Sequence, residues 1–146
     1  MEESISLLER IKRDFGLEEI DLRTYSPLTL AFVGDCIYDL IIRTVAVERH
    51  NTSPERLHRE KSRLVKAQTQ AQMSQVLLPY LTPEEEAVYR RGRNAKSYTT
   101  AKNASVADYR KATGLEALYG YLYLDGREER LLELIRISLR ELELSL

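Results

Sequence analysis

Two carboxylate residues in apolar surroundings are the best candidates for chemistry in this chain. Asp35 lies within the run LTLAFVGDCIY at residues 28–38, and Glu116 lies within LEALYG at residues 115–120. A carboxylate on an apolar helix surface is costly unless a partner compensates its charge. Mg²⁺ is such a partner, because it takes one or two carboxylates with waters and phosphate oxygens and activates water for phosphodiester hydrolysis. We therefore expect Asp35 and Glu116 to be metal ligands and catalytic residues.

Small residues beside both acids would let two helices approach closely. Gly34 precedes Asp35, and Gly120 lies one helical turn after Glu116. If the helices cross at these glycines, the two carboxylates face each other and repel unless a cation neutralises them. Two other interpretations stay open, namely that Asp35 is a satisfied polar residue and that Glu116 pairs with an Arg or Lys of a neighbouring helix. Asp39, one turn after Asp35, could simply be solvated.

The elements that must position these acids are helices. Ser-Pro and Thr-Pro pairs at 26–27, 53–54 and 82–83 are typical helix starts, apolar residues recur at helical spacing, and no strand-like alternation occurs. The polar stretch 94–105 is predicted to be a loop. We predict an all-α fold of six or seven helices, with a bend or break near 67–69. The predicted helical segments are 4–15, 27–49, 54–81, 82–93, 106–124 and 127–144.

Length and composition indicate one domain spanning residues 1–146. The single cysteine, Cys36, rules out an internal disulfide, fits a reducing cytoplasm and is predicted to be a small buried hydrophobic residue. The acidic N-terminus has no signal-peptide features, and charges break every apolar stretch well short of the roughly 18 residues of a membrane span. We therefore expect a cytoplasmic protein with no membrane partner.

Basic residues are concentrated in one part of the chain. Between residues 89 and 111 there are seven Lys or Arg and one acid, Asp108, whereas both ends of the chain lean acidic. This asymmetry predicts a basic face that binds an anionic partner. A second basic stripe, which could instead be a solvated helix face, consists of Arg56, Arg59, Arg63 and Lys66.

Three segments together resemble the ribonuclease III family. LAFVGDCIY at residues 30–38 is similar to the family's signature LEFLGDAV, and LEALYGYLYLD at 115–125 is similar to its second motif, FEALIGAIYLD. RGRNAKS at 91–97, with the polar residues that follow it, resembles the basic loop of the Mini-ribonuclease III branch. The resemblance covers residues 25–140, and the three motifs together are far more specific than any one of them.

The chain lacks several acids of the family's pattern. Leu28 and Ala31 replace glutamates of the signature helix, and Thr113 replaces an aspartate just before the second motif. Only Asp35 and Glu116 match the family's catalytic acids. The Mini branch has a similarly reduced set, so the loss does not imply an inactive protein. The Thr113 hydroxyl could still orient a metal-bound water.

The resemblance implies a homodimeric endoribonuclease with a ribonuclease III-like helical fold. It implies Mg²⁺, which Mn²⁺ can replace, and cleavage of both strands of double-stranded RNA to leave 5′-phosphate ends. The family's role implies the large-subunit (23S) ribosomal RNA precursor as the substrate, with a ribosomal protein as an assisting partner. The apolar signature helix agrees with a helix at a dimer interface.

The double-stranded-RNA-binding domain of full-length ribonuclease III is expected to be absent from this chain. The basic segment is therefore expected to hold RNA, with cations on phosphates and polar groups on 2′-hydroxyls. The expected RNA-binding residues are Arg90, Arg91, Arg93, Asn94, Lys96, Ser97, Thr99, Thr100 and Lys102.

Two other functions are compatible with these residues. One is a non-catalytic double-stranded-RNA-binding protein on the same fold, in which the missing acids reflect lost activity. The other is a helical dimer that makes only protein contacts. Mg²⁺-dependent RNA products would exclude both, and RNA affinity that weakens with salt would exclude the second.

Overall fold

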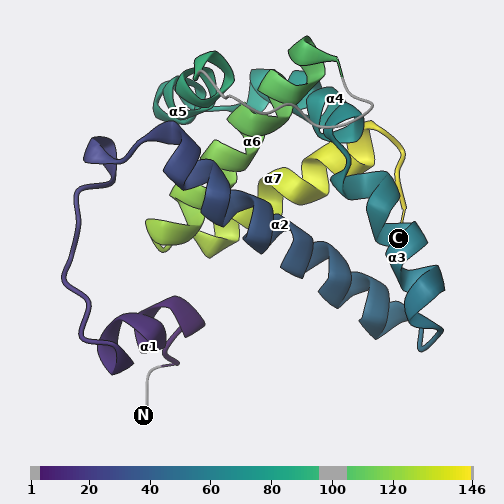
Figure 1. The fold of residues 1–146 in the computed structure, drawn as a ribbon, viewed down its shortest axis with the longest axis horizontal. Coiled ribbons are helices and arrows are strands. Elements are labelled where there is room, and N and C mark those ends of the chain that lie inside the picture. Colours follow the sequence, from purple (N-terminus) through teal and green to yellow (C-terminus); the bar gives the residue numbers. More distant parts are fainter. Residues whose placement is uncertain (1–3, 96–104, 146) are drawn as a thin grey trace.

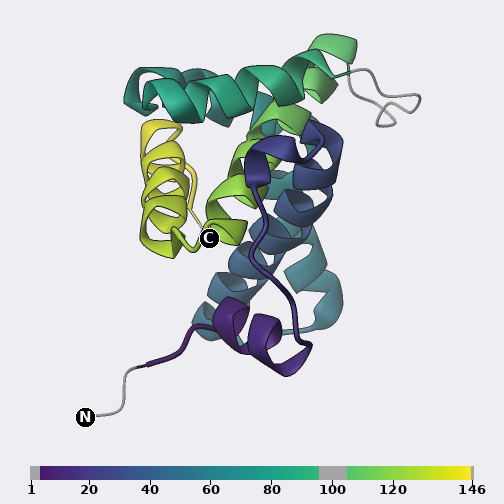
Figure 2. The ribbon, with the colours of Figure 1, turned by 90° about the vertical axis from the view of Figure 1, so that its left-hand side faces the viewer.

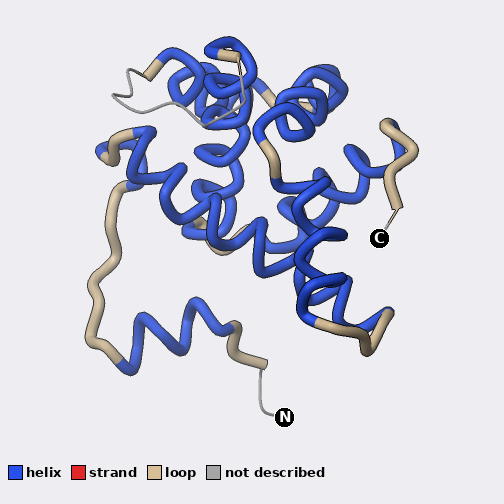
Figure 3. The backbone as a smooth tube through the Cα atoms, turned by 45° about the vertical axis from the view of Figure 1, so that its right-hand side comes forward, coloured by secondary structure: helices blue, strands red, loops and turns tan. Residues whose placement is uncertain are grey.

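The computed structural model describes residues 4–95 and 105–145, which are mostly helical (Figures 1 and 3). A long connection with one short 3₁₀ helix joins the N-terminal helix to the next α-helix (Figure 1). The prediction of an all-α fold with six or seven helices is confirmed, because the described residues contain seven α-helices, two short 3₁₀ helices and no strand. The α-helices are α1 (Leu7–Asp14), α2 (Pro27–Arg49), α3 (Pro54–Val65), α4 (Ala67–Leu77), α5 (Pro83–Asn94), α6 (Val106–Leu124) and α7 (Glu128–Glu141), and the 3₁₀ helices are η1 (Leu22–Thr24) and η2 (Leu78–Tyr80).

Local signals place most helix boundaries. The serines before α2, α3 and α6 accept hydrogen bonds from backbone N–H groups of the first turn, and a capping box opens α5. The predicted bounds 27–49 and 106–124 agree with α2 and α6. The predicted break near 67–69 comes one residue earlier, at Lys66, whose extended backbone separates α3 from α4.

Several helix ends differ from the prediction. The first helix is Leu7–Asp14 where 4–15 was expected, and the helical segment expected to reach 81 ends its α-helix at Leu77. The last helix was expected to reach 144, but α7 ends at Glu141 because Glu143 has a φ of 54° and the Leu144 N–H bonds to the Leu139 carbonyl. Asn94 was expected to begin a loop and is instead the last residue of α5. The rest of that predicted loop, apart from Ala95 and Ser105, lies outside the described residues.

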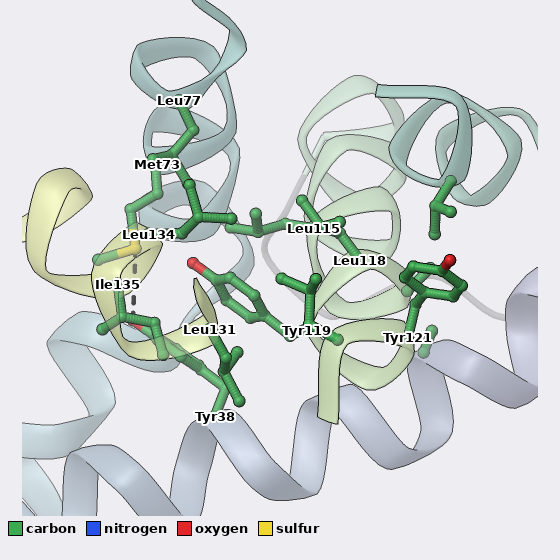
Figure 4. Close-up of a cluster of buried hydrophobic side chains, with 14 of the residues drawn as sticks. Tyr38, Met73, Leu77, Leu115, Leu118, Tyr119, Tyr121, Leu131, Leu134 and Ile135 are labelled. Atoms are coloured by element: carbon green, nitrogen blue, oxygen red, sulfur yellow. Dashed lines mark hydrogen bonds between the residues drawn. The ribbon is translucent and has the colours of Figure 1, made fainter. Parts of the chain in front are cut away.

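The central element of the fold is α6. It packs against α2, α4, α5 and α7, and Figures 1 and 2 show α2 crossing it while α5 lies across one end. The main apolar cluster combines side chains of these helices, and within it Tyr38 of α2 stacks on Tyr119 of α6 with ring centroids 5.4 Å apart (Figure 4). The N-terminal helix α1 lies apart from this cluster (Figure 1).

Glycines let α2 and α6 touch backbone to backbone. A Cβ atom on Gly34 would lie 1.7 Å from the carbonyl oxygen of Glu116, and a Cβ on Gly120 would lie 1.9 Å from that of Leu30. No side chain can occupy such a space, so only glycine fits at either position. The prediction that the two helices cross at Gly34 and Gly120 is confirmed.

The prediction that Cys36 is buried is wrong, because its side chain is exposed. Gly34 and Tyr38 face α6 and are buried. A helix turns about 100° per residue, so Cys36, two residues from both Gly34 and Tyr38, lies on the opposite side of α2. Within the part of the chain that the structure describes, no helix is both long and apolar enough to cross a membrane.

Candidate active site

The crossing of α2 and α6 brings Asp35 and Glu116 together. Gly34, beside Asp35, contacts the backbone of Glu116 directly. Asp35 is exposed and Glu116 is half-buried. Burial raises the pKa of Glu116 to about 9, with further contributions from hydrogen bonding to Asp35 and from its negative charge. The two carboxyl groups are therefore neighbours in the fold, although they are far apart in the sequence.

Within the described part of the chain, no cationic side chain compensates either acid. Among residues 4–95 and 105–145, no Lys, Arg or His forms an ion pair with Asp35 or Glu116. The interpretation of Glu116 as an ion-pair partner is thus not supported by the described helices. Instead, burial and then the neighbouring Asp35 raise the pKa of Glu116, so this carboxyl group favours its protonated form.

This pair fits a hard divalent cation. No group of three or more His, Cys, Asp or Glu side chains with metal-binding geometry occurs in the described segments. Two carboxylates are nevertheless sufficient for Mg²⁺, which keeps several waters and also binds substrate phosphates. A bound cation would offset both the burial and the charge of Asp35 that favour protonated Glu116, so the donor set and its electrostatics agree with a cation site formed by Asp35 and Glu116.

A third polar side chain, which the sequence analysis missed, reaches this site from α4. Gln70 is buried, and hydrogen bonding from its amide opposes the rise in the pKa of Glu116. A signal was present in the sequence. The buried face of α4 has helical spacing but combines polar Gln70 and Ser74 with apolar Met73 and Leu77.

Two other residues considered in the sequence have structural partners. Asp39 is not simply solvated, because its carboxylate lies 3.0 Å from Arg43 Nε and 3.3 Å from Lys61 Nζ. The Thr113 hydroxyl donates a 2.9 Å hydrogen bond to the Tyr109 carbonyl within α6. The hydroxyl proton of Thr113 is therefore already hydrogen-bonded within α6.

The first four predicted RNA-binding residues all lie at the end of α5. Arg90 pairs with Glu86 at 2.6 Å, and an Arg91 Nη donates to the Tyr25 carbonyl at 3.3 Å. The Arg93 guanidinium lies 5.9 Å from the centre of the Tyr89 ring. An open groove of about 420 Å³ is lined by Pro27, Ala87, Arg90, Arg91, Asn94 and Ala95.

The other predicted RNA-binding residues, Lys96, Ser97, Thr99, Thr100 and Lys102, lie outside the described residues. In the second basic stripe, Arg56 pairs with Glu60 of the same helix at 3.5 Å. Arg59, Arg63 and Lys66 have exposed side chains.

Known proteins and a family sequence model are similar to most of this chain. A sequence model described as the ribonuclease III domain matches residues 28–127, which include both acids. A protein of Clostridium tetani described as Mini-ribonuclease 3 is 44% identical over 118 residues, which are 80% of this chain and 78% of that protein. A protein of Enterococcus faecalis with the same description is 48% identical over 123 residues, 83% of this chain and 93% of that protein.

A solved structure has a similar fold. The crystal structure of a Fusobacterium nucleatum protein superimposes with a TM-score of 0.76 at 31% sequence identity. The match covers 84% of this chain and 98% of that one. The helical arrangement described above is therefore also found in a protein whose structure was determined by X-ray crystallography.

Proposed function

This chain belongs to the ribonuclease III family, in its Mini-ribonuclease 3 branch, and from that premise we propose that Asp35 and Glu116 form its Mg²⁺-dependent active site. The protein is an endoribonuclease of double-stranded RNA that hydrolyses phosphodiester bonds and leaves 5′-phosphate ends. The observation that carries the proposal is the pair of neighbouring carboxyl groups, with which no cationic side chain among residues 4–95 and 105–145 forms an ion pair. Members of the family generally use divalent metal ions, and we propose Mg²⁺, with Mn²⁺ as a substitute.

The two acids would share the cation but do different work. When bound, the ion neutralises phosphate charge and supplies an activated water. Asp35 is exposed, so an RNA phosphate can reach the pair from its side. Glu116 is half-buried between helices, which keeps its carboxyl group in one place and shields it from bulk water. Its proton must leave before it can act as a ligand, because its pKa is about 9 without a cation.

The decisive test compares Asp35→Asn with Asp39→Asn, one turn further along α2. Asp35→Asn removes a charge from an exposed position and should keep the fold, yet abolish cleavage of a duplex RNA in Mg²⁺. Asp39 pairs with Arg43 and Lys61 instead of Glu116, so Asp39→Asn should cleave at a rate close to the wild type. Gel analysis with Mg²⁺ and with EDTA gives the answer, and cleavage by Asp35→Asn at a wild-type rate would disprove the proposed site.

We propose that RNA is held mainly by the end of α5 and the residues that follow it. The groove beside Arg90, Arg91 and Asn94 supports this, because it is open and carries two guanidinium groups. Arg93, Lys96, Ser97, Thr99, Thr100 and Lys102 complete the proposed surface. The side chain of Glu86, which pairs with Arg90, is 44% exposed, so an RNA phosphate can take its place beside Arg90.

We also propose that the protein works as a homodimer. The support is an apolar stripe on α2 that this chain leaves uncovered, formed by Leu28, Phe32, Leu40 and Val47, which are 39%, 81%, 50% and 55% exposed. These positions recur at the spacing of one helix face. A second copy of the same stripe would cover it with twofold symmetry.

The natural substrate that we propose is the large-subunit (23S) ribosomal RNA precursor, with a ribosomal protein as an assisting partner, in the cytoplasm. Similarity to the Mini-ribonuclease 3 proteins supports this assignment. We further propose that residues 1–146 act as a single nuclease domain, since α2, α4, α5 and α7 all pack on α6. Mapping the cut ends of a precursor transcript with and without ribosomal proteins tests the substrate and the partner together.

A further inference from the structure

Gln70 occupies an unusual place beside the acid pair. Its side chain is only 2% exposed, and its Nε2 donates a 2.8 Å hydrogen bond to the carbonyl of Val65, at the end of α3. The same side chain also hydrogen-bonds to the Glu116 carboxyl group. Its Oε1 is fully buried and accepts no hydrogen bond from any residue that the structure describes.

A glutamine at this position is costly as a packing residue. A buried polar atom without a partner costs about 1–3 kcal/mol, and an apolar side chain of similar size would avoid that cost. The neighbouring positions on the buried face of α4 include Met73 and Leu77, so the site accepts apolar side chains. The amide orientation is also determined, because exchanging its oxygen and nitrogen would place Oε1 against the Val65 carbonyl oxygen.

We propose that Gln70 is a positioning residue of the acid pair, whose amide N–H holds the Glu116 carboxylate in place facing Asp35. The Val65 carbonyl anchors the amide, and the amide in turn anchors Glu116. Gln70 therefore prepares Glu116 to act as a metal ligand without being one itself. This inference rests on the proposed function, because it assigns Gln70 to the same cation site.

A purely structural role is the competing explanation. Gln70 could serve only to cap the break between α3 and α4 through Val65, much as the Thr69 hydroxyl bonds to the Arg63 carbonyl at 2.6 Å. In that case its removal lowers stability but leaves the cation site of the folded protein unchanged. Metal affinity measured without RNA separates the two explanations.

The experiment compares Gln70→Met with Gln72→Met, a matched control at an exposed position of the same helix. Both are measured at a temperature where circular dichroism shows a folded protein. We expect Gln70→Met to weaken Mn²⁺ binding to RNA-free protein about 10- to 100-fold by calorimetry, as is usual when the partner of a metal ligand is lost. Its kcat should fall and recover as the metal concentration rises, while its KM for RNA stays within about twofold, a split that follows from an effect on the metal site alone. Gln72→Met should match the wild type.

A measurement on the wild-type protein tests the inference without relying on any variant to fold. In ¹⁵N spectra, the side-chain amide of Gln70 should shift on addition of Mg²⁺ and broaden at a lower Mn²⁺ ratio than that of Gln72, which should not shift with Mg²⁺. An unaffected Gln70 amide, or Mn²⁺ affinity in Gln70→Met equal to that in Gln72→Met, overturns the inference. The Asp35→Asn variant shows whether such a result disproves only the role of Gln70 or the cation site as a whole. If Asp35→Asn is inactive while Gln70→Met behaves like its control, only the role of Gln70 is wrong, whereas an active Asp35→Asn disproves the cation site itself.

Discussion

At the scale of single residues, Asp35 and Glu116 carry the same chemical group in different surroundings. Asp35 is exposed to solvent, whereas Glu116 lies partly between helices, where burial and then the neighbouring Asp35 raise its pKa to about 9. At neutral pH without a cation, Glu116 therefore holds a proton. A cation bound at the proposed site would have to displace this proton, so metal binding and protonation would compete at one carboxyl group.

This competition predicts how metal affinity depends on pH. Because the pKa of Glu116 is raised to about 9, lowering the pH below that value increasingly favours the proton over the metal. We expect the apparent Mn²⁺ affinity to increase between pH 6 and pH 9, by up to about tenfold per unit for one displaced proton, and to level off above pH 9. Calorimetry in buffers of different ionisation enthalpy should show about one proton released per ion at pH 7. An affinity independent of pH would contradict this account.

At the scale of helices, the site depends on how closely α2 and α6 approach. The two backbones touch at Gly34 and Gly120, and the acids flank this contact. Any side chain at either glycine must push the helices apart. Stability and activity are therefore linked at this crossing, because the same contact that completes the core also holds Asp35 near Glu116.

Gly34→Ala tests this link. The added Cβ would lie 1.7 Å from the Glu116 carbonyl oxygen, so we expect a loss of about 3 kcal/mol or more in unfolding free energy, as for severe overpacking, together with a loss of cleavage. Gly16→Ala is the matched control, since its Cβ meets nothing within 4 Å and only its φ of 62° is unfavourable. That variant should lose about 1–2 kcal/mol and keep its activity. Urea unfolding and cleavage assays measure both, and a fully active Gly34→Ala would contradict the crossing described here.

A second connection between helices runs through a buried acid on α5. The Glu85 carboxylate is 0% exposed, accepts hydrogen bonds from Arg130 of α7 at 2.8 and 2.9 Å, and caps its own helix through the Thr82 N–H at 2.9 Å. Burial raises the pKa of Glu85, but the hydrogen bonds and the positive charges of Arg130 and Arg127 outweigh it and hold this pKa below its usual value. The ionised group therefore contributes stability above its unfolded pKa, and this contribution is lost as the pH falls through the lowered one.

Glu85→Gln should destabilise the fold by about 3 kcal/mol at pH 7, because it leaves Arg130 without its buried charge partner. Glu86→Gln, one residue further in the same turn, breaks only the exposed pair with Arg90 and should change stability by less than about 0.5 kcal/mol. Urea unfolding at pH 7 and at pH 3 measures both variants. The difference between Glu85→Gln and the wild type should shrink between pH 7 and pH 3, because proton uptake below the unfolded pKa progressively cancels the stability that the ionised group contributes. Equal stabilities at pH 7 would disprove its role.

At the scale of the whole molecule, apolar and basic surfaces lie on different helices. The exposed apolar stripe follows α2, from Leu28 to Val47, whereas the basic residues gather at the end of α5. The stripe begins on the same helix that carries Asp35. A second copy packed on α2 would therefore place two acid pairs in one particle, as cleavage of both strands of a duplex requires.

Phe32→Glu tests the proposed dimer. Phe32 is 81% exposed in the single chain, so a glutamate there should leave the protomer folded while it places two like charges at the centre of the interface. We expect light scattering to show a dimer for the wild type and a monomer for Phe32→Glu. Leu132→Glu, at an exposed apolar position of α7, is the control and should remain dimeric. A monomeric wild type would refute the proposal.

Local sequence alone determined the helices of this protein. The bounds of α2 and α6 were predictable because caps, prolines and apolar spacing act within one or two turns of the chain. The approach of Asp35 and Glu116 was also predictable, because glycines adjacent to the acids and the resemblance to a known family indicated the same crossing. Only these short-range signals and motifs can be recognised before the helices are assembled.

Tertiary structure decided which side chains meet and which face solvent. Gln70 reaches Glu116 only because α4 packs on α6, and Arg130 reaches Glu85 only because the folded chain brings part of α7 within hydrogen-bonding distance of α5. Cys36 is exposed because the rotation of α2 turns Gly34 and Tyr38 toward the core. These outcomes depend on the rotation and neighbours of whole helices, which are set by packing among residues distant in sequence.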